Sequence, residues 1–162
     1  MNLKTASELL NNAGRIAIIG NGGNLAIAQH AASDIYRHTG KFTFAPNAVE
    51  LTALGGDGDW KFDWIEYAEQ NADLIIGITC RVNSPIATSL VPVNDISMLI
   101  APKSHGLLRT LVLDYETYHE FEVNTLMVFY KMMEYIGAVS YTHLRAHETR
   151  EDLVCRLVGE KK

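Results

Sequence analysis

A glycine-rich segment, Gly20-Asn21-Gly22-Gly23-Asn24, separates a short apolar run from a segment of helical composition. Glycines permit positive φ and let a ligand approach the backbone closely. The first turn of the following helix offers unpaired N–H groups at the positive end of the helix dipole. With side-chain donors from Asn21 and Asn24, the segment predicts a site for phosphate or another small oxyanion. The alternative is a tight strand-to-helix turn that binds no ligand.

The same segment does not carry a nucleotide-binding motif. A dinucleotide fingerprint, G-x-G-x-x-G, that starts at Gly20 requires glycine where the chain has Leu25, and no P-loop lysine follows. We therefore expect a small phosphate ligand and no nucleotide cofactor.

Two residues suited to proton transfer, His30 and Asp34, follow on the same predicted helix. They are four residues apart and therefore share one helix face. Such a pair can transfer a proton at a carbon beside a carbonyl, where an acid or a metal stabilises the developing oxyanion. A phosphate held at Asn21 to Asn24 would place the rest of its ligand near both side chains. The alternative is a surface His–Asp pair on an amphipathic helix.

A second loop, from Thr79 to Ser84, follows a strongly apolar run and carries further candidate ligands for the anion. Thr79 and Ser84 can donate hydrogen bonds, and Arg81 can pair with phosphate directly, a strong contact when it is bidentate. Asp57, between two glycines, can bond a sugar hydroxyl or simply belong to a turn. We include Asp57, Thr79, Arg81 and Ser84 among the predicted substrate-binding residues.

Apolar runs and helical patterns alternate along the chain. The runs are typical of strands buried on both faces of a parallel sheet, and they occupy Arg15–Ile19, Lys41–Ala45, Asp73–Thr79, Ile96–Ala101 and Thr110–Asp114. The periodicity predicts helices at Thr5–Ala13, Leu25–Arg37, Trp60–Gln70, a short one opened by Ser84-Pro85, and Tyr118–Ile136. This alternation predicts an α/β fold with a parallel sheet that has helices on both faces.

Length and charge place the chain in a broad class. It has 162 residues, 48% of them apolar, and a formal net charge of −5, which fits one globular domain. No segment approaches the roughly 18 uninterrupted apolar residues of a membrane helix, and the N-terminus does not resemble a secretory signal. The two cysteines form no disulfide framework, and no basic stripe suggests nucleic acid. We expect a cytoplasmic protein that binds neither nucleic acid nor a membrane.

The last part of the chain, residues 139–162, differs in character from the rest. It includes the string Ser140-Tyr-Thr-His-Leu-Arg-Ala-His-Glu-Thr149, which resembles a translated adapter or read-through sequence. We expect residues 1–138 to form the sugar-phosphate-binding domain and residues 139–162 to be a non-native tail, which we exclude from functional reasoning.

Together these motifs resemble the phosphoheptose isomerase family of SIS-domain (sugar isomerase) proteins. The resemblance covers about residues 14–136 and rests on Gly20–Asn24, Gln29-His30 with Asp34, Leu54–Asp57, Asp73–Thr79 with Asn83-Ser84, and the helix near His119-Glu120. It implies a three-layer α/β/α sandwich with a five-stranded, Rossmann-like parallel sheet. It also implies a homo-oligomer, a dimer or tetramer, whose sites are completed by a neighbouring subunit. The implied reaction converts sedoheptulose 7-phosphate to a heptose 7-phosphate.

The resemblance also implies roles for individual residues. His30 is a metal ligand or polar catalytic group, and Asp34 takes the place of the family's glutamate base. His119 falls where many relatives carry a glutamine metal ligand, so His30, Asp34 and His119 become candidate catalytic residues and candidate ligands of zinc. The family's catalytic histidine is Met127 here, and a thioether cannot transfer a proton.

Three functions stay open at this point. The first is the isomerase. The second is a non-catalytic SIS module that acts as a sugar-phosphate sensor or as a protein adaptor of the kind associated with the replication initiator. The third is a structural α/β domain without a ligand, which the composition of the glycine loop disfavours.

Overall fold

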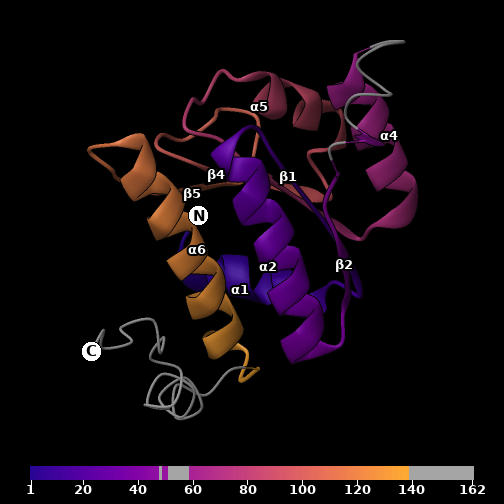
Figure 1. The fold of residues 1–162 in the computed structure, drawn as a ribbon, viewed down its shortest axis with the longest axis vertical. Helices are drawn as coiled ribbons and strands as arrows, with labels where there is room; N and C mark the ends of the chain where they lie inside the picture. Colours follow the sequence, from indigo (N-terminus) through magenta and orange to yellow (C-terminus); the bar gives the residue numbers. More distant parts are fainter. Residues whose placement is uncertain (48, 51–58, 139–162) are drawn as a thin grey trace, which may run out of the picture.

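The computed structural model describes residues 1–47, 49–50 and 59–138 (Figure 1). Within these residues, five parallel strands form one sheet in the order β2-β1-β3-β4-β5. The strands are β1 (Arg15–Gly20), β2 (Phe42–Phe44), β3 (Leu74–Ile78), β4 (Ser97–Ala101) and β5 (Thr110–Val112). The predicted five-stranded parallel sheet is confirmed.

Helices cover both faces of the sheet (Figure 1). One face carries α1 (Leu3–Asn12), α2 (Gly23–Thr39) and α6 (Tyr118–Tyr135), and the other carries α4 (Trp60–Asn71) and α5 (Pro85–Leu90), which is followed by the 3-10 turn η1 (Val91–Val93). This is the α/β/α sandwich that the sequence predicted. None of the described helices is long and apolar enough to span a membrane.

The sheet divides the hydrophobic core into two parts. In β1, Ile16 and Ile18 face α1, α2 and α6, whereas Ala17 and Ile19 face α4 and α5. Successive side chains of a strand point to opposite faces, so a strand covered on both sides is expected to be apolar at nearly every position. Every residue of β3 and β4 is buried, and all of them are apolar except Ser97 at the start of β4. This explains why continuous apolar runs, without alternation, marked the strands in the sequence.

Local signals set several of the element ends. Ser84 caps α5 through a hydrogen bond from the Ala87 amide, and Pro85 takes the first helical position, as predicted. Gly40, with a φ of 71°, ends α2 two residues beyond the predicted end. The prediction that residues 139–162 are a non-native tail, like the predicted role of Asp57, lies outside the described residues.

Candidate functional site

The predicted ligand residues lie at the carboxyl edge of the sheet. Gly20 at the end of β1 pairs with Ile78 at the end of β3, so the β1–α2 loop and the loop after β3 leave the sheet side by side. In the sheet, β1 has β2, the next strand in the chain, on one side and β3 on its other side, so the strand order reverses at β1. In open α/β sheets, ligands bind at such a reversal of strand order, outside the carboxyl ends of the strands.

The glycine loop forms a sharp turn into α2. Gly22 is the N-cap of α2 and has a φ of 57°, a conformation that glycine adopts without steric cost. At Gly20, a Cβ would lie 2.6 Å from the carbonyl oxygen of Asn24, so only glycine fits beneath the first turn. Asn21, Gly22 and Gly23 are exposed. The backbone at the start of this 17-residue helix is therefore partly exposed at the surface.

A carboxylate from α6 already lies at this helix end. A Cβ at Gly23 would overlap the Glu122 carboxylate, which means that Glu122 contacts the backbone of the first turn. Negative charge is stabilised at a helix N-terminus. No local sequence signal indicates this contact, because it depends on how α6 lies across α2. An anionic ligand at this end would have to displace Glu122.

Asn24 joins the two loops. Its side chain is 7% exposed, and its Nδ2 donates to the Sγ of Cys80, 3.4 Å away. Its Oδ1 is buried and has no hydrogen-bond partner among the described residues. Predicted as a ligand residue, Asn24 thus lies buried between the β1–α2 loop and the loop after β3.

The hydroxyl groups of the loop after β3 are used within the protein. Thr79 is 6% exposed, and its Oγ1 accepts from the Arg81 amide at 3.1 Å and donates to the Arg81 carbonyl at 3.0 Å. Ser84 caps α5. Arg81 remains available to an anion. The pKa of its guanidinium is raised above its ordinary value, chiefly by the hydrogen bond with Tyr118 at the start of α6.

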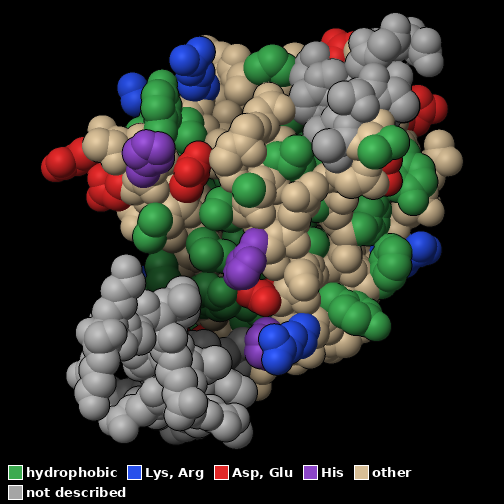
Figure 2. Space-filling view, in the orientation of Figure 1, with side chains coloured by type: hydrophobic (Ala, Val, Ile, Leu, Met, Phe, Trp, Pro, Cys, Tyr) green, Lys and Arg blue, Asp and Glu red, His purple; other side chains and the backbone are tan. Residues whose placement is uncertain are grey.

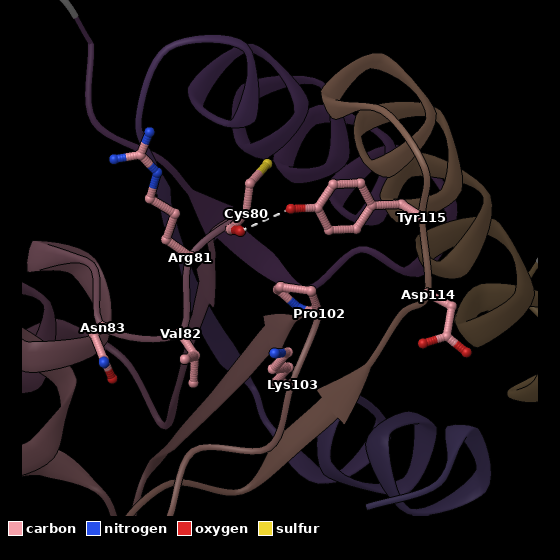
Figure 3. Close-up of a pocket in the computed structure, with 8 residues that line it drawn as sticks. All are labelled: Cys80, Arg81, Val82, Asn83, Pro102, Lys103, Asp114 and Tyr115. Carbon is pink, nitrogen blue, oxygen red and sulfur yellow. Dashed lines mark hydrogen bonds between the residues drawn. The ribbon is translucent and has the colours of Figure 1, made fainter.

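A cleft of about 550 Å³ opens beside Arg81, between the loops that follow β3, β4 and β5. Figure 3 shows Tyr115 reaching across it, where its hydroxyl donates to the Cys80 carbonyl at 3.0 Å. Burial raises the pKa of Tyr115, so this hydroxyl stays a donor. Lys103 adds a second cation to the lining and Asp114 an anion. The sequence analysis missed the cleft, because three loops far apart in the chain build it.

His30 and Asp34 form a hydrogen-bonded cluster with Tyr130 of α6. Nε2 of His30 lies 3.1 Å from Oδ2 of Asp34 and 3.1 Å from the Tyr130 hydroxyl. The hydroxyl donates to the same Oδ2 at 2.9 Å. The side chain of His30 is 53% exposed and that of Asp34 is 17% exposed. Burial, and then the hydrogen bond to Asp34, raise the pKa of Tyr130 to about 12. Figure 2 shows this face of α2 and α6, where histidine and acidic side chains stand among apolar ones.

The chain is similar in sequence to two curated relatives. The chain is 29% identical over 118 residues to phosphoheptose isomerase 1 of Campylobacter jejuni, a match that covers 64% of the chain and 63% of the relative. It is 32% identical over 117 residues to the phosphoheptose isomerase of Aliarcobacter butzleri, covering 64% of the chain and 59% of the relative. The match thus spans less than two thirds of the length of either relative. No family model matches the chain.

Solved structures of the same kind share the fold. The phosphoheptose isomerase of Neisseria gonorrhoeae superposes with a TM-score of 0.69 at 22% identity, covering 85% of both chains. That of Francisella tularensis gives a TM-score of 0.67 at 18% identity, with the same coverage.

The chain is therefore similar in sequence and in fold to phosphoheptose isomerases. The same fold also occurs in the C-terminal domain of a glucosamine-fructose-6-phosphate aminotransferase from F. tularensis, with a TM-score of 0.56 at 11% identity over 89% of this chain and 43% of that one. The fold therefore serves proteins of several names, and the chemistry of this chain has to be argued from its own residues.

The three zinc ligands implied by the resemblance do not lie together among the described residues. Among residues 1–47, 49–50 and 59–138, no three His, Cys, Asp or Glu side chains come close enough to hold a metal ion. The side chain of His119 is 96% exposed, and its Nδ1 lies 4.0 Å from Glu122. That places His119 near the N-terminus of α2. His30 lies about 10 Å further along the helix axis, at about 1.5 Å per residue. Within the described residues, His30, Asp34 and His119 therefore form no three-ligand group.

Three further residues of α6 bear on the resemblance to the family. Met127, at the position of the family's catalytic histidine, is 40% exposed. Glu120 accepts a hydrogen bond from the Glu116 amide at 2.8 Å, and its own amide donates to Thr117. Glu120 therefore takes part in capping α6. Tyr130, one turn beyond Met127, is the α6 residue that reaches His30 and Asp34.

Proposed function

We propose that this protein is a sugar-phosphate isomerase that converts sedoheptulose 7-phosphate to a heptose 7-phosphate by proton transfer through an enediol. The observation that carries the proposal is the His30–Asp34 pair, with Nε2 and Oδ2 3.1 Å apart. The pair lies on the helix that the glycine turn begins. A solvent-accessible imidazole that is oriented by a carboxylate is a recurrent arrangement for moving a proton. Relatives named phosphoheptose isomerase support the same reaction.

The phosphate group would bind at the carboxyl edge of the sheet. The guanidinium of Arg81 is one donor there, and the backbone amides at the start of α2 would become donors to the phosphate once it displaces Glu122. Helix N-termini bind phosphate through such amides without net positive charge. Thr79 and Ser84 would shape the loop and not contact the ligand, because both hydroxyls already have partners.

We further propose that the protein acts in the cytoplasm as a homo-oligomer, as the resemblance implies. His30 is about half exposed. A dimer or tetramer would cover this face with a neighbouring subunit and exclude water from the reacting sugar.

The test is incubation of the full chain with sedoheptulose 7-phosphate, followed by proton NMR of the sugar. We expect heptose 7-phosphate to appear, and we expect His30→Ala to slow its formation by about 100-fold or more, the usual contribution of a general acid or base. His38→Ala is the matched control, because His38 is an exposed histidine of the same helix. No product from the folded wild-type protein would contradict the proposal.

A second function, a sugar-phosphate sensor or protein adaptor without turnover, is favoured by one observation. Met127 replaces the histidine with which relatives transfer a proton, and it is 40% exposed, so it is not simply a core residue. Calorimetry with sedoheptulose 7-phosphate separates the two. Binding without product would assign the sensor, and the absence of both would leave the adaptor.

A further inference from the structure

The cluster of His30, Asp34 and Tyr130 allows its protons to be assigned. Three atoms form a triangle: Nε2 of His30, the Tyr130 hydroxyl oxygen and Oδ2 of Asp34, with edges of 3.1, 2.9 and 3.1 Å. The hydroxyl has one proton, and it goes to the carboxylate, which can only accept. The hydroxyl therefore presents a lone pair to Nε2.

This arrangement selects one tautomer of His30. Nε2 faces two acceptors, the Tyr130 oxygen and the Asp34 carboxylate, so the neutral imidazole carries its proton on Nε2. Nδ1 is then unprotonated, and it has no hydrogen-bond partner among the described residues. The side chain is 53% exposed. The contacts of Nε2 with Asp34 and Tyr130 thus orient the imidazole so that the basic Nδ1 faces solvent.

We propose that Nδ1 of His30 is the proton acceptor of the isomerisation, and that Asp34 and Tyr130 are positioning residues that fix its tautomer and orientation. The inference rests on the proposed function and changes one role within it. The resemblance makes Asp34 the base, but Oδ2 of Asp34 points at Nε2 and the Tyr130 hydroxyl, and its side chain is 17% exposed. Of the two groups, the imidazole is the more accessible to a ligand.

Nδ1 removes a proton from C1 of the ketose, the C–H electron pair becomes the C1=C2 double bond, and the carbonyl oxygen at C2 takes up a proton from water to give the enediol. The imidazolium then returns its proton to C2, the C1 hydroxyl gives its proton back to the water-derived hydroxide, and C1 becomes the aldehyde. While Nδ1 is protonated, the positive ring lies beside the Asp34 carboxylate, which stabilises it.

The first test reads the tautomer without reference to activity. In long-range ¹H–¹⁵N NMR of the labelled full chain, we expect the His30 signals to show a protonated Nε2 and an unprotonated Nδ1 in neutral rings. The signals are assigned by their loss in His30→Gln. In Asp34→Asn, the new amide group can donate to Nε2, so the proton should move to Nδ1. A proton on Nδ1 of His30 in the wild-type chain would overturn the proposal.

The second test separates the roles by kinetics. Glutamine at position 30 keeps a donor for Asp34 but has no basic nitrogen, so His30→Gln should lower kcat about 100-fold or more while KM changes little. Retention of kcat within about tenfold would instead assign the base to Asp34. Tyr130→Phe should lower kcat about tenfold, because the carboxylate loses a charge-assisted hydrogen bond. Tyr135→Phe, at an exposed tyrosine of the same helix, should have no effect.

These outcomes distinguish this inference from the proposed function. A wild-type chain with the predicted tautomer and no isomerase activity would refute the isomerase and leave the geometry correct. Activity that survives Tyr130→Phe unchanged, in a variant with the wild-type circular dichroism spectrum, would remove the role of Tyr130. A wild-type chain that is active as an isomerase but carries the His30 proton on Nδ1 would refute only the role of His30 and leave the proposed function intact.

Discussion

The contact between Glu122 and the first turn of α2 leads to a prediction about anion affinity. The carboxylate contacts Gly23, at the helix end where an anionic ligand would bind. Replacing it in Glu122→Gln removes one negative charge and keeps nearly the same shape. A phosphate in this position should then bind more tightly, because it no longer meets a like charge.

The size of the effect follows from charge and exposure. Glu122 is 31% exposed, so solvent screens it strongly. Two unit charges about 4 Å apart interact with about 1 kcal/mol in water, and a phosphate monoester carries between about one and a half and two charges. The expected gain is about 1.5–2 kcal/mol, or roughly tenfold to thirtyfold in Kd. The substitution also removes the favourable interaction between the carboxylate and the positive end of the α2 dipole. This should lower the free energy of unfolding by about 0.3–1 kcal/mol.

The assay is calorimetric titration of inorganic phosphate at low salt into the wild-type chain and Glu122→Gln. Glu134→Gln is the matched control, since Glu134 is exposed on the same helix and the change in net charge is identical. Equal affinities for Glu122→Gln and wild type would refute the reasoning that the anion binds at the N-terminus of α2. An equal gain in the Glu134→Gln control would show that overall charge, and not this contact, is responsible.

Four further predictions concern stability and metal. Gly77→Ala should lower the free energy of unfolding by about 1–3 kcal/mol in urea titrations, because the new Cβ would overlap Leu90 in the core between the sheet and α5, and an unchanged midpoint would contradict this packing. Thr117→Ala should cost about 1 kcal/mol by the same measurement, since it removes the N-cap that accepts from the Glu120 amide at 3.2 Å, and a neutral result would show that water replaces the cap. The folded-state pKa of Tyr130 is raised from 10.0 to about 12, so its contribution to stability should be lost as pH rises from about 10 to about 12, and Tyr130→Phe should flatten that part of the stability–pH curve. Isomerase activity should survive dialysis against a chelator, because the described residues assemble no three-ligand group; activity that is lost and then restored by zinc would show that the ligands come together in the assembled protein.

Local sequence signals predicted much of the fold. The buried strands are apolar at nearly every position, and such runs stand out against the helical patterns between them. The glycine turn depends on residues within five positions of one another, so Gly20 and Gly22 revealed it without knowledge of the rest of the chain. The cap at Ser84 was equally local. The order of the strands was not local, and the five-stranded sandwich was expected from the resemblance to a family.

The chemistry of the candidate site was decided by the packing of α6 against α2. The spacing of His30 and Asp34 indicated that they share a helix face. It could not show that Tyr130 of α6 contacts both of them, because the hydroxyl comes from a residue 96 positions away from Asp34. The same packing brings Glu122 to Gly23 and leaves His119 apart from the pair. Periodicity in a sequence determines which face of a helix is apolar. Which polar atoms then meet depends on how two helices far apart in the chain cross, and only the tertiary structure determines that crossing.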